Sequence, residues 1–293
     1  MSDGLSILVT AYQTHDYVGP MLASIFESFS SFSLKTEVLL GVDACKQTLL
    51  SVSQSERPAN VRVFWSERNV GTYVLSNALL SHRAYEWAIR LDSDDIILPT
   101  MSDYVAGAMK EGTDICRMPW SPLTRLVSSQ GKERVKVSSA FGTALFSPSV
   151  FSVLGGYEPW RCAGDSNLVH RAKLAGLSVS SPRHYGAAFL YRNRPENLTN
   201  DQSTAWCSRE RRQNHRITRR TVQAYVKPVV CPLTDLTDLL KQGGPDVVKG
   251  VRVDDAESLP ARAPRVRVSR RIGPPRQKNI SHRACITRRT GRI

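Results

Sequence analysis

The chain lacks several features that would assign it to a class at once. It has no C-x-x-C pair, which excludes a zinc ribbon, and its six cysteines show no disulfide framework; they are Cys45, Cys116, Cys162, Cys207, Cys231 and Cys285. No apolar run approaches the roughly 18 residues of a transmembrane helix. The N-terminus lacks the basic residues and long apolar stretch of a signal peptide. These absences predict a soluble protein of a reducing cytoplasm.

Charge divides the chain into unlike parts. Apolar residues make up 41% of the 293 residues, which is enough for a packed core, and the formal net charge is +14. Residues 1–200 contain 19 Lys/Arg and 18 Asp/Glu, so their charges nearly balance. Residues 201–293 contain 21 Lys/Arg and 8 Asp/Glu, so nearly all of the excess positive charge lies there. We therefore predict a folded domain over 1–200 and a basic, partly helical extension over 201–242. Few bulky apolar residues follow, so 243–293 is predicted to be a disordered tail rich in Arg and Pro.

Short apolar runs alternate with helical patterns along the predicted domain. Strands are predicted at 5–10, 37–43, 61–65, 87–92, 178–180 and 187–191. Helical patterns cover 20–29, 71–88, 165–175, 209–216 and 233–240, and a further helix begins near Pro99. This alternation indicates an α/β fold with βαβ units, a mostly parallel sheet and helices on both faces. Ligands bind beyond the carboxyl ends of such strands, where Thr10, Asp43 and Asp92 fall.

Three carboxylates lie within four residues at the end of the fourth predicted strand. They are Asp92, Asp94 and Asp95. Like charges this close repel one another, and burial would be costly without a compensating cation. A hard divalent ion that also holds substrate phosphates needs only one or two protein carboxylates, and Asp92 and Asp94 are the candidates. The alternative is an exposed acidic turn or a helix cap.

Five short motifs follow one another from residue 5 to about residue 200. They are Val9-Thr10-Ala11-Tyr12, Gly41-Val42-Asp43, Asn69-Val70-Gly71 with Asn77, Leu91-Asp92-Ser93-Asp94-Asp95, and Gly155-Gly156-Tyr157 with Gly164-Asp165. In this order and spacing they resemble the family-2 type of glycosyltransferase, in a variant similar to phage and bacterial members. The resemblance implies a GT-A fold, with a mixed, mostly parallel Rossmann-like sheet.

The resemblance also implies a nucleotide-sugar site. Thr10 and Tyr12 match the stretch that cradles the nucleobase and ribose, and Asp43 matches the acid that binds the base. A carboxylate can accept a hydrogen bond from a uracil or guanine N–H, so the expected donor is a UDP- or GDP-sugar. The remaining residues of the matched motifs expected to contact the donor are Asn69, Gly71, Asn77 and Asp92.

The implied chemistry needs a cation and a base. Asp92 and Asp94 match the pair that contacts the ribose and the diphosphate-bound Mn²⁺ or Mg²⁺, which stabilises the leaving group. Asp165 matches the general base that takes the acceptor's proton, and one base opposite the leaving group implies inversion. Asp165 precedes a helical pattern, whose dipole favours its ionised form. Without the resemblance, Asp165 would be interpreted as an ordinary helix cap.

The sequence departs from the family pattern at two places. Gly164 precedes Asp165, where an acidic residue is frequent, and Arg194 stands in the histidine position of a Tyr-Arg-x-His-Pro motif. An arginine cannot ligate a metal but can clamp a diphosphate, so Arg192 and Arg194 are predicted phosphate contacts. The alternative for Arg194 is an exposed loop arginine. His184 is a fallback metal ligand, although a lone histidine is more often structural.

Two classes of function follow. The first is an inverting glycosyltransferase, whose acceptor is left open. The second is a non-catalytic or redirected nucleotide-binding protein of GT-A type, because fold does not fix function. The basic tail is either a solvated extension or an attractor of nucleic acid or an anionic surface. It has few aromatic residues, which disfavours stacking on bases.

Overall fold

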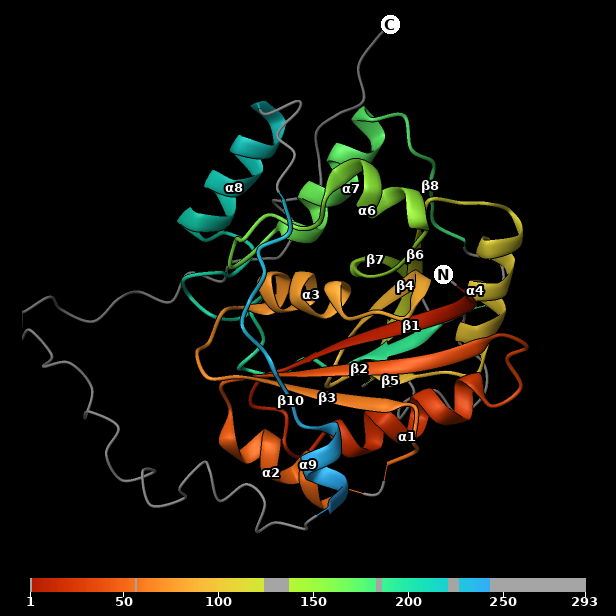
Figure 1. Ribbon diagram of the computed structural model, residues 1–293. Coiled ribbons are helices and arrows are strands. Elements are labelled where there is room, and N and C mark those ends of the chain that lie inside the picture. The colour runs from red at the N-terminus through yellow and green to blue at the C-terminus, as the bar shows by residue number, and fades with distance from the viewer. Residues whose placement is uncertain (1, 56, 124–136, 183–185, 221–226, 243–293) are drawn as a thin grey trace, which may run out of the picture. The chain divides into compact units, whose positions relative to one another are not determined.

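The computed structural model describes residues 2–55, 57–123, 137–182, 186–220 and 227–242, all within one compact unit. The predictions for His184 and for the tail 243–293 lie outside these residues. The strands are β1 (Ser2–Ala11), β2 (Lys35–Asp43), β3 (Val61–Ser66), β4 (Tyr85–Asp92), β5 (Ile96–Ile97), β6 (Ile115–Pro122), β7 (Ser138–Phe146), β8 (Val179–Ser180), β9 (Phe189–Tyr191) and β10 (Thr234–Asp235). The helices are α1 (Val18–Phe29), α2 (Lys46–Gln54), α3 (Thr72–Ser81), α4 (Thr100–Lys110), α6 (Pro148–Leu154), α7 (Gly164–Leu174), α8 (Arg209–Arg220) and α9 (Thr237–Gln242) (Figure 1).

The described strands form one mixed sheet, which confirms the predicted α/β fold. Its order is β10-β3-β2-β1-β4-β7-β6-β9-β5, with β8 beside β6. Strands β3, β2, β1 and β4 are parallel, and β7 then runs antiparallel to β4. The chain order reverses at β1, which has β2 on one side and β4 on the other. A ligand crevice is expected at the carboxyl ends of strands at such a switch point, and there Thr10 pairs with Asp92.

Helices cover both faces of the sheet, as the sequence predicts. In Figure 1, α1, α2 and α4 cover one face, while α3, α6 and α7 cover the other. Alternate residues of β1 serve the two cores: Ile7 and Val9 pack with α1, whereas Leu8 packs with α3. This two-sided burial explains why β1 is a continuous apolar run rather than an alternating one.

One predicted helix extends too far, and another helix was not predicted. Helix α3 ends at Ser81, and β4 begins at Tyr85, so the helical pattern predicted to 88 runs too far. Tyr85 and Trp87 are two residues apart, which is strand spacing, and Trp87 is held in register opposite Leu5 of β1. Helix α2 was not predicted, because it buries only Thr48, Leu49 and Val52 and therefore has a weak apolar pattern.

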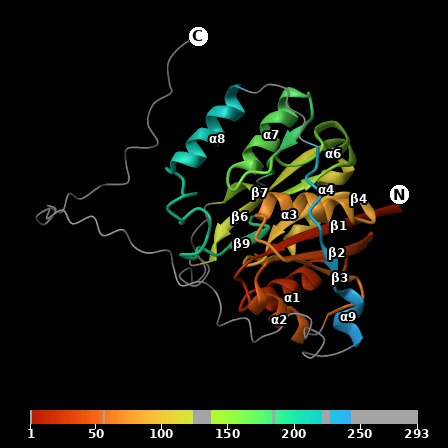
Figure 2. The same ribbon diagram turned by 60° about the vertical axis from the view of Figure 1, so that its left-hand side comes forward.

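The segment after residue 200 adds elements to the same unit. Helix α8 lies beside α7 (Figure 2), where Asn167 Nδ2 donates to Thr218 Oγ1 at 3.1 Å. The predicted helix at 233–240 is a short strand, β10, followed by α9; β10 pairs with β3 at the sheet edge, and Leu240 joins the core on the α1 side. No helix in the described part of the chain is long and apolar enough to cross a membrane.

Candidate active site

A chain of polar contacts crosses the switch point between β1 and β4. Thr10 Oγ1 lies 2.8 Å from Thr72 Oγ1 at the start of α3. Arg90 Nη2 donates to Thr72 Oγ1 and to Asp92 Oδ1, both at 2.6 Å. Burial opposes the charge of Arg90, but the surrounding acids, Asp92 first, raise its pKa above its ordinary value. Arg90 was not predicted, although a charged residue inside an apolar strand signals a buried ion pair.

Asp165 lies in the same place, although it belongs to the first turn of α7. A Cβ atom on Gly142 would lie 3.6 Å from Asp165 Oδ2 and 3.7 Å from Asp92 Oδ2. The two carboxylates therefore face one point beside β7, which Arg90 Nη1 approaches still more closely, at 3.1 Å. The sequence predicts both residues for the site, and the structure brings them together.

Tyr73 supports Asp165 from α3. Its hydroxyl donates to Asp165 Oδ1 at 3.0 Å, and Ser166 N–H donates to the same oxygen at 2.8 Å. Burial, and then the charge of Asp165, raise the pKa of Tyr73 well above its ordinary value, so the hydroxyl remains a donor at neutral pH. A Cβ on Gly164 would lie 2.8 Å from Tyr73 Cδ2. The tyrosine ring thus explains why glycine precedes Asp165.

The two predicted phosphate-binding arginines fold back onto the carboxylates. Arg194 Nε donates to Asp94 Oδ2 at 2.7 Å, and its Nη1 donates to Gln13 O at 3.1 Å. Arg192 Nε donates to Asp94 O, and Arg192 N–H donates to Asp95 Oδ1, both at 3.0 Å. The side chain of Arg194 is only 11% exposed, so it is not the exposed loop arginine of the alternative interpretation.

Tyr17 holds these arginines in place. The guanidinium carbons of Arg192 and Arg194 lie 4.6 Å and 5.1 Å from the centre of its ring. Such cation–π contacts restrict both side chains to the rim of the carboxylate cluster. Tyr17 immediately precedes α1 and was not predicted, because no local pattern marks it.

The carboxylate cluster is accompanied by three arginines, because Arg90 contacts Asp92, Arg194 contacts Asp94, and Arg192 contacts Asp94 and Asp95. Burial and the charge of Asp92 raise the pKa of Asp94, while Arg194 opposes the shift. Asp95 is 1% exposed, and its Oδ2 has no hydrogen-bond partner among the described residues. The buried, unpartnered Oδ2 of Asp95 is the feature of this cluster that an additional cation would satisfy.

The donor set decides which cation fits. In the described part of the chain, no three His, Cys, Asp or Glu side chains form a group that would hold a metal. Asp92 and Asp94 offer hard carboxylate oxygens, which suit Mn²⁺ or Mg²⁺ when substrate phosphates and water supply the other ligands. The residues therefore fit a metal that arrives with a diphosphate rather than a metal held by protein alone.

Asp43, at the end of β2, anchors the turn before α3. Its Oδ1 accepts from Val70 N–H at 2.8 Å, and its Oδ2 accepts from Gly71 N–H at 2.9 Å. Burial raises the pKa of Asp43 above its ordinary value, and the two hydrogen bonds partly oppose this shift. Gly71 has a φ of 82°, which glycine adopts without steric cost. Each carboxylate oxygen keeps a second lone pair, so Asp43 still has the capacity to accept the predicted hydrogen bond from a nucleobase.

The other residues predicted to contact the nucleotide sugar differ in their exposure to solvent. Tyr12 is 45% exposed after β1, and Asn69 is exposed on the same turn as Gly71. The structure gives Asn77 another role, because its side chain is only 1% exposed. Asn77 Nδ2 donates to Tyr157 O, and Asn77 Oδ1 accepts from Tyr157 N–H. Asn77 thus holds the Gly-Gly-Tyr turn rather than facing the crevice.

Backbone strain is concentrated around this crevice. Among the described residues, the non-glycine positions with positive φ are Gln13, Ala44 and Ala163. They follow β1, follow β2 and precede α7 respectively. Such conformations cost roughly 1 kcal/mol or more each and are often found where function requires them.

Comparison with known proteins places this geometry in a structural class. No protein-family profile and no curated protein matches the sequence. Solved structures do match, including S. aureus TarS in complex with UDP-GlcNAc, with a TM-score of 0.52 and 18% identity over 67% of this chain and 60% of that one. TarS in complex with UDP has a TM-score of 0.51 and 18% identity over 66% and 62%. This chain thus spans less than two thirds of the TarS chains.

Another solved structure matches more of the chain. Mannosyltransferase PcManGT from Pyrobaculum calidifontis, in complex with GDP-Man and Mn²⁺, has a TM-score of 0.56 and 13% identity over 87% of this chain and 75% of that one. At these identities the likeness concerns the fold. The fold is that of the GT-A glycosyltransferases, as the motifs predicted.

Proposed function

We propose that this chain is an inverting glycosyltransferase that moves a sugar from a nucleoside diphosphate sugar to an acceptor hydroxyl. The observation that carries this proposal is the approach of Asp92 and Asp165 to one point beside Gly142, at the switch point of a GT-A fold. A carboxylate on the sugar-nucleotide side and a second carboxylate at a helix N-terminus are the two groups that the reaction needs.

The donor occupies the crevice at the ends of β1, β2 and β4. Thr10 and Tyr12 contact the nucleoside, and Asp43 uses a free lone pair to accept a base N–H. Asn69 and Gly71 border the same region. Support for a uridine or guanosine diphosphate sugar comes from the structural matches, which hold UDP-GlcNAc and GDP-Man.

The diphosphate lies between carboxylates and arginines. Asp92 and Asp94 would hold Mn²⁺ or Mg²⁺, whose charge stabilises the diphosphate as it leaves. Arg192 and Arg194, stacked on Tyr17, supply further N–H donors to the phosphate oxygens. The structural match to PcManGT, which contains Mn²⁺, supports the metal.

Asp165 acts as the general base. It accepts the proton of the acceptor hydroxyl while that oxygen attacks the anomeric carbon from the face opposite the diphosphate, which inverts the configuration. Tyr73 and the N–H of Ser166 both hydrogen-bond Oδ1, so Oδ2 is the oxygen left to take the proton.

The test measures donor binding and donor hydrolysis. UDP, GDP, UDP-GlcNAc and GDP-Man are titrated calorimetrically with Mn²⁺ or Mg²⁺, and hydrolysis of the two sugar nucleotides is followed. We expect metal-dependent binding of one base type that weakens at least about tenfold in Asp94→Ala. Asp103→Ala, which removes an exposed acid of α4, should leave it unchanged. Absence of binding with either metal, or normal binding by Asp94→Ala, would reject the proposal.

A further inference from the structure

Gly142 of β7 is a glycine for a reason other than its backbone conformation. It is not among the described glycines with positive φ, so an alanine could adopt the same backbone conformation without strain. The residue is only partly buried, whereas Thr143, which follows it on the strand, is buried. The reason for glycine at this position therefore lies in the space that a Cβ atom would take.

That space lies between three charged side chains. A Cβ on Gly142 would be 3.1 Å from Arg90 Nη1, 3.6 Å from Asp165 Oδ2 and 3.7 Å from Asp92 Oδ2. In the proposed reaction Asp92 lies on the diphosphate side, and Asp165 is the base. The transferred sugar has to lie between these two groups, because its anomeric carbon is bonded to the diphosphate and is attacked from the opposite face.

The groups around Gly142 also have the chemistry of a sugar site. A sugar hydroxyl can donate to a carboxylate and accept from a guanidinium at the same time. Asp92 and Asp165 offer acceptor oxygens, and Arg90 Nη1 carries two N–H bonds, one of which goes to Gly142 O at 2.7 Å. Arg90 Nη2 donates to Thr72 and to Asp92, so the guanidinium is fixed in position. The three groups therefore form a polar site of defined shape.

We propose that the sugar ring of the nucleotide sugar lies against the bare Cα of Gly142, and that Gly142 is a specificity-determining residue because only glycine leaves room for the ring. This inference rests on the proposed function, since it assigns a residue to the sugar of the same substrate. A methyl group at position 142 would take the place of the ring. The nucleoside and diphosphate, which lie at the ends of β1, β2 and β4, would not meet it.

The alternative is that Gly142 only makes room for Arg90. At 3.1 Å from a Cβ, Arg90 Nη1 would have to shift by a few tenths of an ångström in an alanine variant. Arg90 binds Asp92, which is a proposed metal ligand. A role in packing alone would therefore weaken the binding of a nucleoside diphosphate and of its sugar nucleotide equally, whereas a sugar contact weakens the binding of the sugar nucleotide alone.

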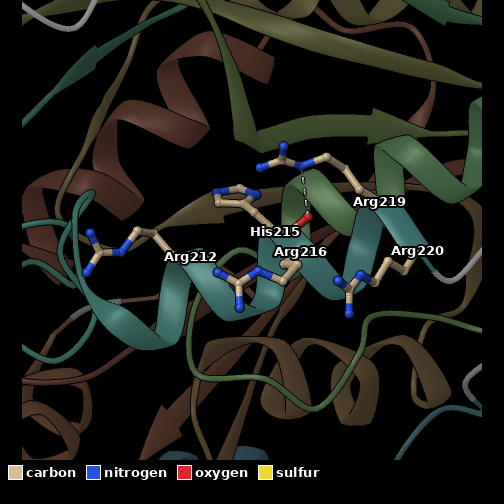
Figure 3. Close-up of a pocket in the computed structure, with 5 residues that line it drawn as sticks. All are labelled: Arg212, His215, Arg216, Arg219 and Arg220. Atoms are coloured by element: carbon tan, nitrogen blue, oxygen red, sulfur yellow. Dashed lines mark hydrogen bonds between the residues drawn. The ribbon is translucent and has the colours of Figure 1, made fainter.

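The arginine-lined groove of α8 supplies none of these three groups. It has a volume of about 450 Å³, and its lining is Arg212, His215, Arg216, Arg219 and Arg220 (Figure 3). A different face of α8 carries Asn214 and Thr218, which contact Cys162 and Asn167 on the side of α7. The groove therefore faces away from α7, and a variant within it serves as a control for the sugar position.

The experiment compares wild type with Gly142→Ala. UDP, GDP, UDP-GlcNAc and GDP-Man are titrated calorimetrically with Mn²⁺ present, and hydrolysis of the two sugar nucleotides is followed. In Gly142→Ala we expect the affinity for the sugar nucleotide that wild type binds to fall about tenfold or more, and its hydrolysis to fall at least as much. The affinity for the corresponding nucleoside diphosphate should stay within about twofold, which also shows that the variant is folded.

Two controls keep wild-type affinities. Gly107→Ala adds the same methyl group in α4, where a Cβ meets no atom within 4 Å, and Arg216→Gln alters the groove of α8. Wild-type affinity for the sugar nucleotide in Gly142→Ala would overturn the assignment. A parallel loss of both affinities would overturn it in favour of packing against Arg90. If wild type binds none of the four nucleotides, the proposed function fails and this inference fails with it.

Discussion

Arg194 Nε lies 2.7 Å from Asp94 Oδ2, and a hundred residues of chain separate the two. Their side chains are 11% and 10% exposed, so this ion pair is largely removed from water. Arg194 stands in the histidine position of the Tyr-Arg-x-His-Pro motif that the sequence resembles, and it neutralises a carboxylate proposed to face the metal. The pair therefore holds the arginine that we propose as a diphosphate contact against the carboxylate that we propose as a metal ligand.

Replacing Arg194 tests this arrangement. Arg194→Gln removes the charge-assisted bond to Asp94 and a proposed clamp on the diphosphate. We expect the affinity for the nucleoside diphosphate to fall about tenfold to a hundredfold, as measured by calorimetry with Mn²⁺ present. Arg161→Gln, at an exposed position, is the control. Wild-type affinity in Arg194→Gln would show that the arginine has only a structural role.

The role of Asp165 is separable from donor binding. Asp165→Asn keeps the shape of the side chain but cannot accept the acceptor's proton. Transfer should therefore fall by about 10²-fold to 10⁴-fold, while donor affinity stays within about twofold. Single-turnover kinetics and calorimetry on one preparation measure both quantities. A parallel loss of donor affinity and transfer would contradict the assignment as base.

Tyr73 is expected to act through Asp165. Tyr73→Phe removes the 3.0 Å hydrogen bond but keeps the ring that packs against Tyr157. We expect kcat to fall about tenfold with an unchanged KM for the donor, because only the orientation of the base is disturbed. Tyr157→Phe is a matched control, since the Tyr157 hydroxyl is buried and has no hydrogen-bond partner among the described residues. Equal effects of the two substitutions would reject a positioning role.

A pH-dependent contribution to stability is expected far from the active site. Asp114 accepts hydrogen bonds from Ser147 Oγ, Ser149 Oγ and both N–H and Oγ of Ser178. Burial opposes ionisation, but these bonds together hold the pKa of Asp114 below its ordinary 3.8. Its folded-state pKa is depressed, so the stabilisation is present above pH 3.8 and is lost as the pH falls through the lower, folded-state value.

The corresponding variant is Asp114→Asn. At pH 6 we expect its free energy of unfolding in urea to be lower than that of wild type by about 1 kcal/mol, since charge-assisted bonds are lost at a partly exposed site. The difference should shrink as the pH falls below 3.8, where wild type loses the same charge. Asp103→Asn, at an exposed position of α4, should show no such change. A difference that is constant with pH would contradict the assignment.

Local patterns were sufficient for much of the fold. The apolar run at Leu5–Thr10 and the carboxylates that end β2 and β4 predicted parallel strands, because side-chain periodicity depends only on neighbouring residues. Parallel strands meet at one edge, so Thr10, Asp43 and Asp92 were expected together before any contact was known. The weak helix α2 and the end of α3 could not be predicted, because packing and register with β1 override the local pattern there.

The sequence alone determined which residues carry reactive groups and at which strand ends the first of them lie. Only the tertiary structure decided that α7 brings Asp165 to Asp92, that Arg194 returns to Asp94, and that Tyr17 stacks on two arginines. It also decided that Asn77 faces the turn at Tyr157. These contacts join residues far apart in the chain, and packing around the sheet, rather than any neighbouring residue, sets the distances between them.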